Sequence, residues 1–91
     1  MRTVRRKIVF HTDAFEDFVN WSIVNKNIFK RIAELLKDIQ RNSFEGKGKP
    51  EPLKHQFKGW WSRRITDEHR LIYSINEDED VEILSCKGHY D

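Results

Sequence analysis

The hydrophobic pattern of this 91-residue chain changes its period near residue 50, and this change constrains the fold most strongly. Before that point, apolar side chains recur every three or four residues, as they do from Ile28 to Ile39. This spacing is typical of one face of a helix. Beyond that point, bulky apolar and polar residues alternate, as in Arg70 to Ile75, with the period of a strand. The sequence therefore predicts helices followed by a sheet.

The first half predicts a short strand and a helical hairpin. Lys7 to Phe10 is the strand candidate, and Thr12 is suited to cap a helix that runs to about Asn25. The second helix carries the apolar series that ends at Ile39. Residues 42–50 contain two glycines and a proline, so we expect a loop there.

The second half predicts a meander of strands. Short connections such as Lys58-Gly59 and Asp67-Glu68 favour antiparallel hairpins. We expect one α+β domain over residues 1–91, with the helix pair on one face of a curled antiparallel sheet and the other face left for function. The expected strands are Leu53–Phe57, Trp60–Thr66, His69–Asn76 and Val81–Cys86.

Basic residues are unevenly distributed, although the net charge is only +2. Residues 1–6 form a basic N-terminal extension, and residues 46–70 hold seven lysines and arginines against three acids. Such a stretch fits either a nucleic-acid surface or an ordinary solvated face. The single cysteine, Cys86, fits a reducing compartment, and no apolar run reaches the roughly 20 residues that span a bilayer. We expect a cytoplasmic protein without a membrane segment.

Three residues, Arg70, Glu51 and His89, are of types suited to binding a phosphate or to acid–base chemistry on it. Alternation along residues 69–75 places Arg70 on the face away from the helices, where a guanidinium can bind phosphate oxygens; the alternative is an ion pair with Asp67 or Glu68. Glu51 stands between two prolines that stiffen the backbone, and suits a positioned base or a simple polar loop residue. A free glutamate, with a pKa of about 4.3, is a weak base at neutral pH.

The C-terminal His89-Tyr90-Asp91 supplies an imidazole and an aromatic ring, unless it is only a frayed end. A free imidazole has a pKa of about 6.5 and exchanges protons near neutral pH. Tyr90 can stack on a base. Cys86-x-x-His89 is half of a zinc spacing, but no second cysteine exists, so we expect no metal site.

Longer blocks of sequence resemble a known family. The blocks are FEGKGKPEPLKH at residues 44–55, WSRRITDEHRLIY at residues 61–73 and the final His89-Tyr90. Together they resemble the Txe/YoeB toxins of the RelE superfamily over nearly the whole chain from Lys7 onward. The resemblance implies a RelE-like fold and a ribosome-dependent endoribonuclease, an mRNA interferase that cuts in the ribosomal A site without a cofactor.

The resemblance also assigns roles to individual residues. Glu51 corresponds to the family's base, Arg70 to its phosphate-binding arginine, His89 to its general acid and Tyr90 to its C-terminal tyrosine. RNA contacts are assigned to three further basic residues, Lys49, Lys54 and Arg64.

Partners are implied in the same way. They are mRNA on the ribosome, a cognate antitoxin of the YefM/Axe type, operator DNA only through the antitoxin complex, and a second copy in a homodimer. Asp91 and the basic extension depart from the family pattern, and Asp91 is expected to favour a protonated His89. The alternatives are a ribosome binder that does not cleave and a partner whose task is to form a repressor complex with the antitoxin.

Overall fold

The computed structural model describes residues 6–89 as two helices and five strands, which confirms the predicted α+β class. Tyr90, Asp91 and all of the basic extension except Arg6 lie outside the described residues. In chain order the elements are β1 (Ile8–Phe10), α1 (Thr12–Val24), α2 (Lys26–Arg41), β2 (Glu51–Pro52), the 3-10 helix η1 (His55–Phe57), β3 (Trp61–Arg64), β4 (Arg70–Ile75) and β5 (Val81–Ser85).

The strands form one sheet in the order β1-β5-β4-β3-β2. The four later strands pair antiparallel, as the short connections predicted, whereas β1 adds a parallel pair with β5 at one edge. The pairing of β4 with β5 passes from Ile72↔Ser85 to Tyr73↔Ile83, so Leu84 has no partner and forms a bulge. This bulge lies shortly before the C-terminal segment.

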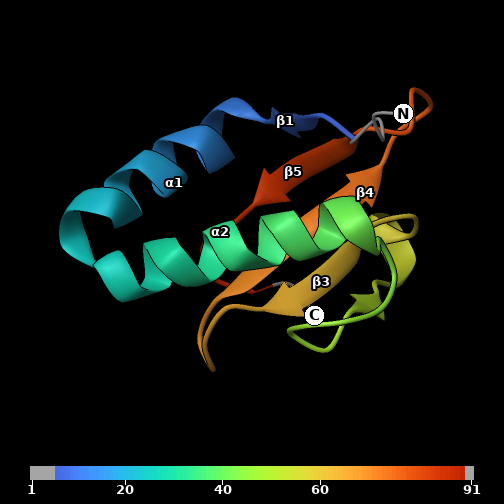
Figure 1. Cartoon of the computed structure of the whole chain (residues 1–91). Coiled ribbons are helices and arrows are strands. Elements are labelled where there is room, and N and C mark those ends of the chain that lie inside the picture. The colour runs from blue at the N-terminus through green and yellow to red at the C-terminus, as the bar shows by residue number, and fades with distance from the viewer. Residues whose placement is uncertain (1–5, 90–91) are drawn as a thin grey trace.

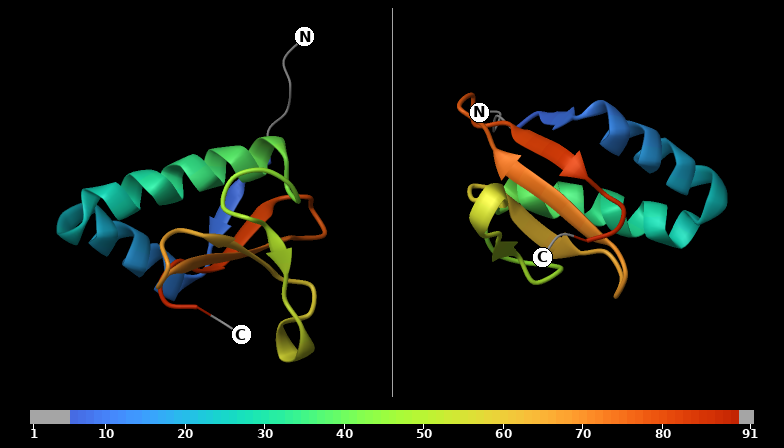
Figure 2. Two further views of the ribbon diagram at one scale, coloured as in Figure 1. Left: turned by 90° about the horizontal axis from the view of Figure 1, so that it is seen from below. Right: turned by 180° about the vertical axis from the view of Figure 1, so that it is seen from behind.

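Both α-helices pack on the same face of the sheet, and among residues 6–89 no α-helix covers the opposite face (Figures 1 and 2). Leu71 and Tyr73 are fully buried against the helices, as alternation predicted, and α2 contributes Ile32, Leu35, Leu36 and Ile39 to this core. Burying a large aliphatic side chain of this kind contributes roughly 1.5–3 kcal/mol. Ile72 is also fully buried, but outside that core cluster.

The two helices begin in different ways. The N-cap of α1 is His11, not Thr12 as predicted, and its side chain makes no cap hydrogen bond. Instead the His11 ring lies 3.2 Å from the Glu82 carboxylate. At α2, the Asn25 side chain accepts hydrogen bonds from the amides of Asn27 and Ile28. Asn25 therefore ends one helix and starts the next.

The predicted strand at Leu53–Phe57 is wrong. The chain forms only the two-residue β2 and then turns through η1, where the Phe57 amide donates to the Lys54 carbonyl at 3.1 Å. His55 adopts a positive φ of 57°, which no strand accommodates. Within residues 6–89, no helix is both long and apolar enough to cross a bilayer.

Candidate active site

A hollow of about 430 Å³ gathers most of the residues that the sequence singled out. Its walls come from β2, η1, β3, the start of β4 and the C-terminal segment. The nine lining residues are Lys49, Glu51, Pro52, Lys54, His55, Ser62, Arg64, Arg70 and His89. All the predicted site residues are therefore in one place except Tyr90, which lies outside the described residues.

Three lining residues, Pro52, Ser62 and His55, were not among the site residues predicted from the sequence. Ser62 stands opposite Glu51 in the β2–β3 pair and two positions before Arg64, so alternation along β3 predicts that these two side chains share a face. His55 had no such signal, because the strand expected there is a 3-10 helix.

A single buried arginine fixes the loop that leads to Glu51. Arg63 is fully buried, and its Nη1 donates to Asp38 Oδ2 at 2.6 Å while its Nε donates to the Tyr73 hydroxyl at 3.2 Å. Its remaining bonds go to the main-chain carbonyls of Asn42, Glu45 and Lys47. This network holds an otherwise irregular loop against α2 and β3.

Asp38 remains ionised in this network. Partial burial tends to raise the pKa of its carboxyl, but hydrogen bonds from the Lys47 amide and the Arg63 guanidinium outweigh burial and lower it. The loop then closes on β3, because the Arg64 amide donates to the Gly48 carbonyl at 2.6 Å. Gly48 has a φ of 83°. The adjacent Lys49 and Glu51 are thereby directed toward the hollow.

Arg70 Nη1 anchors the guanidinium, and within the described part of the chain no hydrogen bond of Nε or Nη2 is found. Nη1 donates to the carbonyls of Thr66 at 2.6 Å, Asp67 at 3.1 Å and His69 at 3.2 Å. Within residues 6–89 it forms no ion pair with Asp67 or Glu68, so the alternative of a surface salt bridge is wrong. Arg70 is half-buried and lines the hollow, and among residues 6–89 its Nε and Nη2 are not engaged, so they can donate to a phosphate.

The only residue of the basic extension that the structure describes has another role. Arg6 Nη1 donates to the Glu79 carbonyl at 2.6 Å and lies 3.5 Å from the Glu79 carboxylate. Its own carbonyl accepts from Gln40. Arg6 thus connects α2 with the β4–β5 turn and does not line the hollow.

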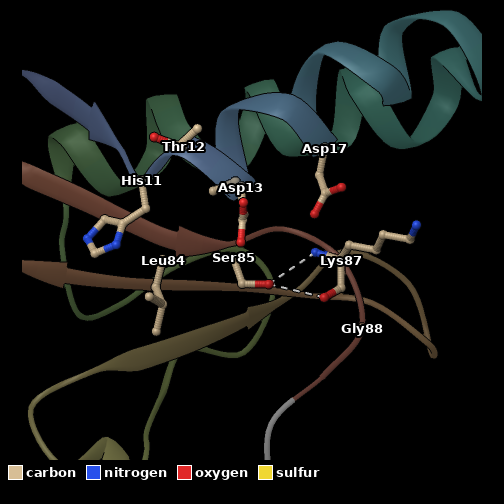
Figure 3. Close-up of a pocket in the computed structure, with 9 residues that line it drawn as sticks. His11, Thr12, Asp13, Asp17, Leu84, Ser85, Lys87 and Gly88 are labelled. Carbon is tan, nitrogen blue, oxygen red and sulfur yellow. Dashed lines mark hydrogen bonds between the residues drawn. The ribbon is translucent and has the colours of Figure 1, made fainter.

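A second hollow, of about 550 Å³, lies at the start of α1 (Figure 3). Lys87 and Gly88 line it, whereas the next residue, His89, lines the first hollow. In Figure 3 the Ser85 hydroxyl bonds to both the amide and the carbonyl of Lys87. The C-terminal segment therefore forms part of the walls of both hollows.

Cys86, the cysteine of the Cys86-x-x-His89 spacing, is placed in the core and not at a metal site. Cys86 is fully buried and its thiol donates to the Ala14 carbonyl at 3.5 Å. Burial, with a smaller contribution from the Asp17 carboxylate, raises the pKa of the Cys86 thiol to about 12, which disfavours the thiolate that zinc requires. Among residues 6–89, no group of three or more His, Cys, Asp or Glu side chains is placed to hold a metal ion.

Both the sequence and the fold match known proteins. The family described as "YoeB-like toxin of bacterial type II toxin-antitoxin system" matches residues 10–90. The chain belongs to the YoeB toxin family. Toxin YoeB of Escherichia coli K12 is 49% identical over 84 residues, covering 92% of this chain and 99% of that protein. Toxin RelK of Mycobacterium tuberculosis H37Rv is 47% identical over 85 residues, covering 93% and 99%.

Solved YoeB structures share the fold. The YoeB dimer from Staphylococcus aureus matches with a TM-score of 0.87 and 48% identity, covering 96% of this chain and 100% of that one. The YoeB–YefM complex from the same organism matches with a TM-score of 0.86 at the same identity and coverage. By its family, this chain is a YoeB-like toxin of the bacterial type II toxin–antitoxin class.

Proposed function

We propose that this toxin is a ribosome-dependent endoribonuclease that cuts mRNA in the A site and so stops translation. The observation that carries the proposal is the convergence of Glu51, Arg70 and His89 in one hollow on the sheet face that the helices leave open. These residues supply a carboxylate, a permanent cation and an imidazole. A surface that only binds RNA requires the cation alone.

The chemistry uses a nucleophile that RNA itself carries. Glu51 accepts the proton of the ribose 2′-hydroxyl as its oxygen attacks the adjacent phosphorus. Arg70 stabilises the negative charge that develops on the phosphate oxygens. His89 donates a proton to the departing 5′ oxygen as the P–O5′ bond breaks. The products are a 2′,3′-cyclic phosphate, or the phosphate formed by its opening, and a free 5′-hydroxyl, and no metal ion is required.

Four further residues assist the three that react. Lys49, Lys54 and Arg64 line the same hollow as exposed cations, and we assign them to the RNA backbone. Tyr90 follows His89 directly and is assigned to arranging the substrate beside it.

The partners follow from the relatives. An S. aureus YoeB has been solved both as a dimer and with YefM. We propose a homodimer, a YefM-type antitoxin that covers the hollow, and contact with operator DNA only through the antitoxin complex. Action on ribosomes places the toxin in the cytoplasm.

Primer extension on programmed ribosomes tests the proposed function. Purified ribosomes carry a defined message, the toxin is added, and the new 5′ ends are mapped. We expect a cut within the A-site codon, which His89→Ala and Arg70→Ala suppress by about a hundredfold or more. An intact message on stalled ribosomes would instead support a non-cleaving translation inhibitor. Undiminished cutting by His89→Ala would remove His89 from the mechanism.

A further inference from the structure

Besides the bond of the Cys86 thiol, three hydrogen bonds of main-chain groups fix the segment before His89 to the rest of the molecule. Trp21 Nε1 donates to the Cys86 carbonyl at 3.1 Å. The Arg70 amide donates to the Gly88 carbonyl at 2.7 Å, and the Gly88 amide donates to His69 Nδ1 at 2.9 Å. Both polar groups of Gly88, the residue before His89, are thus bound to the first residues of the hairpin that carries Arg70.

His69 is itself held firmly in place. Its ring packs edge-on against Trp21, with 4.9 Å between the centroids. Its amide donates to Thr66 Oγ1 at 3.1 Å, and its carbonyl accepts from the Ile65 amide at 3.0 Å. Because a backbone N–H can only donate, His69 Nδ1 is the acceptor in its contact with Gly88, which leaves Nε2 as the ring nitrogen that can donate.

Gly88 makes this contact important. It adopts a φ of 71°, and among residues 6–89, apart from its two neighbours in the chain, no atom lies within 4 Å of where its Cβ would be. A glycine without neighbouring side-chain packing has wide backbone freedom, so its own conformation does not determine where the next residue points. The hydrogen bonds to the Gly88 amide and carbonyl therefore determine the direction in which the chain continues to His89.

We propose that His69 is a positioning residue for His89: it fixes the path of the chain through the Gly88 amide and does not itself touch RNA. His69 is absent from the residues that line the hollow, which agrees with an indirect role. The inference rests on the proposed function, because it assigns His69 a task in the same reaction. Loss of the contact should slow the chemical step and leave RNA binding unchanged, since misplacement of a reacting group by about 1 Å can cost about a hundredfold in rate.

Two amide substitutions separate this role from simple packing. In His69→Asn the side-chain oxygen can occupy the position of Nδ1 and accept from Gly88, whereas in His69→Gln the amide reaches the position of Nε2. Each variant is compared with wild type in single-turnover cleavage on programmed ribosomes, over a range of toxin concentrations. We expect the asparagine variant to cut within a few-fold of the wild-type rate and the glutamine variant to cut at least about tenfold more slowly, at an unchanged half-saturating concentration.

The contact can also be observed directly by NMR. An N–H···N hydrogen bond should transmit a scalar coupling between the Gly88 nitrogen and His69 Nδ1 in 15N-labelled wild type. That coupling should be absent from the glutamine variant, in which the His89 backbone amide should also be less ordered than in the asparagine variant. Melting temperatures of all three proteins, measured at one concentration, show whether each variant is folded.

The cleavage rates and melting temperatures of the two variants decide the inference. Equal cutting by wild type and the glutamine variant overturns the inference, and so does an equal loss of rate and melting temperature in both variants, because that is a packing effect. Should the wild type itself not cut, the proposed function fails. The NMR measurement then decides the inference. It stands if the His89 amide is less ordered in the glutamine variant than in the asparagine variant, and it fails if the two variants are alike.

Discussion

Arg63 Nη1 lies 2.6 Å from Asp38 Oδ2 and joins β3 to α2 beneath the loop that leads to Glu51. The arginine side chain is fully buried, and the aspartate side chain is only 16% exposed. The neighbouring Arg64 is exposed and lines the hollow. Two adjacent arginines, pointing to opposite faces of one strand, therefore have different tasks.

Arg63→Met is expected to lower the free energy of unfolding by roughly 3–5 kcal/mol, because it leaves the Asp38 carboxylate without its partner. Arg64→Ala is the matched control, with a change within about 0.5 kcal/mol and a loss of cleavage instead. Urea denaturation at one protein concentration measures both. Similar stabilities for the two variants would contradict the division of labour between these arginines.

Acid should weaken the protein partly through Asp38. Its pKa in the folded protein lies below the ordinary value of 3.8, so its contribution to stability is present above that pH and is lost as the pH falls through the folded pKa. The difference in free energy of unfolding between wild type and Asp38→Asn should be constant above about pH 5 and shrink below it. A difference that widens on acidification would show that folding raises the pKa of Asp38 and does not lower it.

Cys86 should resist thiol reagents while the protein is folded. Its thiol is buried and its pKa is raised to about 12, so at pH 8 very little thiolate exists and the reagent has no access to it. Mass spectrometry after alkylation should find Cys86 unmodified in buffer and modified in urea. Labelling at the same rate in both conditions would exclude this burial.

Gly48 should tolerate alanine less well than Gly59 does. Both have a positive φ, of 83° and 99°, so both substitutions strain the backbone, by roughly 1–2 kcal/mol. At Gly48 a Cβ would also lie 3.0 Å from Leu35 Cδ2 and 3.1 Å from the Arg64 carbonyl oxygen. At Gly59, apart from the adjacent residues, no atom of the described chain lies within 4 Å. Gly48→Ala should therefore show the larger fall in stability and, by shifting the loop, in cleavage. Equal falls in stability for the two variants would mean that the loop around Gly48 shifts to accommodate the added methyl group without a loss of free energy.

The repeating elements could be predicted from the sequence because their periods are local properties. The apolar series of α2 and the alternation of Leu71 and Tyr73 indicate which faces are buried, and the structure buries them. The parallel pairing of β1 with β5 joins residues some 70 positions apart, and no local pattern encodes that pairing. The N-cap of α1 was predicted one residue too late: it is His11, whose side chain makes no cap hydrogen bond and instead contacts the distant Glu82, a contact that no local pattern reveals.

Most residues of the hollow were found through resemblance to a family, and Arg70 also through alternation. The supporting residues were not found. Arg63 was counted only as part of a basic stretch, and His69 only as the first residue of an expected strand, whereas the structure gives each of them specific distant partners. Supporting roles of this kind depend on which distant backbone groups a side chain reaches, and sequence spacing does not reveal that.

Cleavage of a message with a single 2′-deoxynucleotide immediately 5′ of the cut phosphate tests the central claim most directly. The all-ribose message and the substituted one are placed on identical ribosomes with the toxin, and the new ends are mapped and their phosphates identified. The mechanism predicts that only the all-ribose message is cut at that site and that its upstream fragment ends in a cyclic phosphate or its opened form. Equal cutting of both messages would contradict attack by the 2′-hydroxyl, and with it the roles given to Glu51, Arg70 and His89.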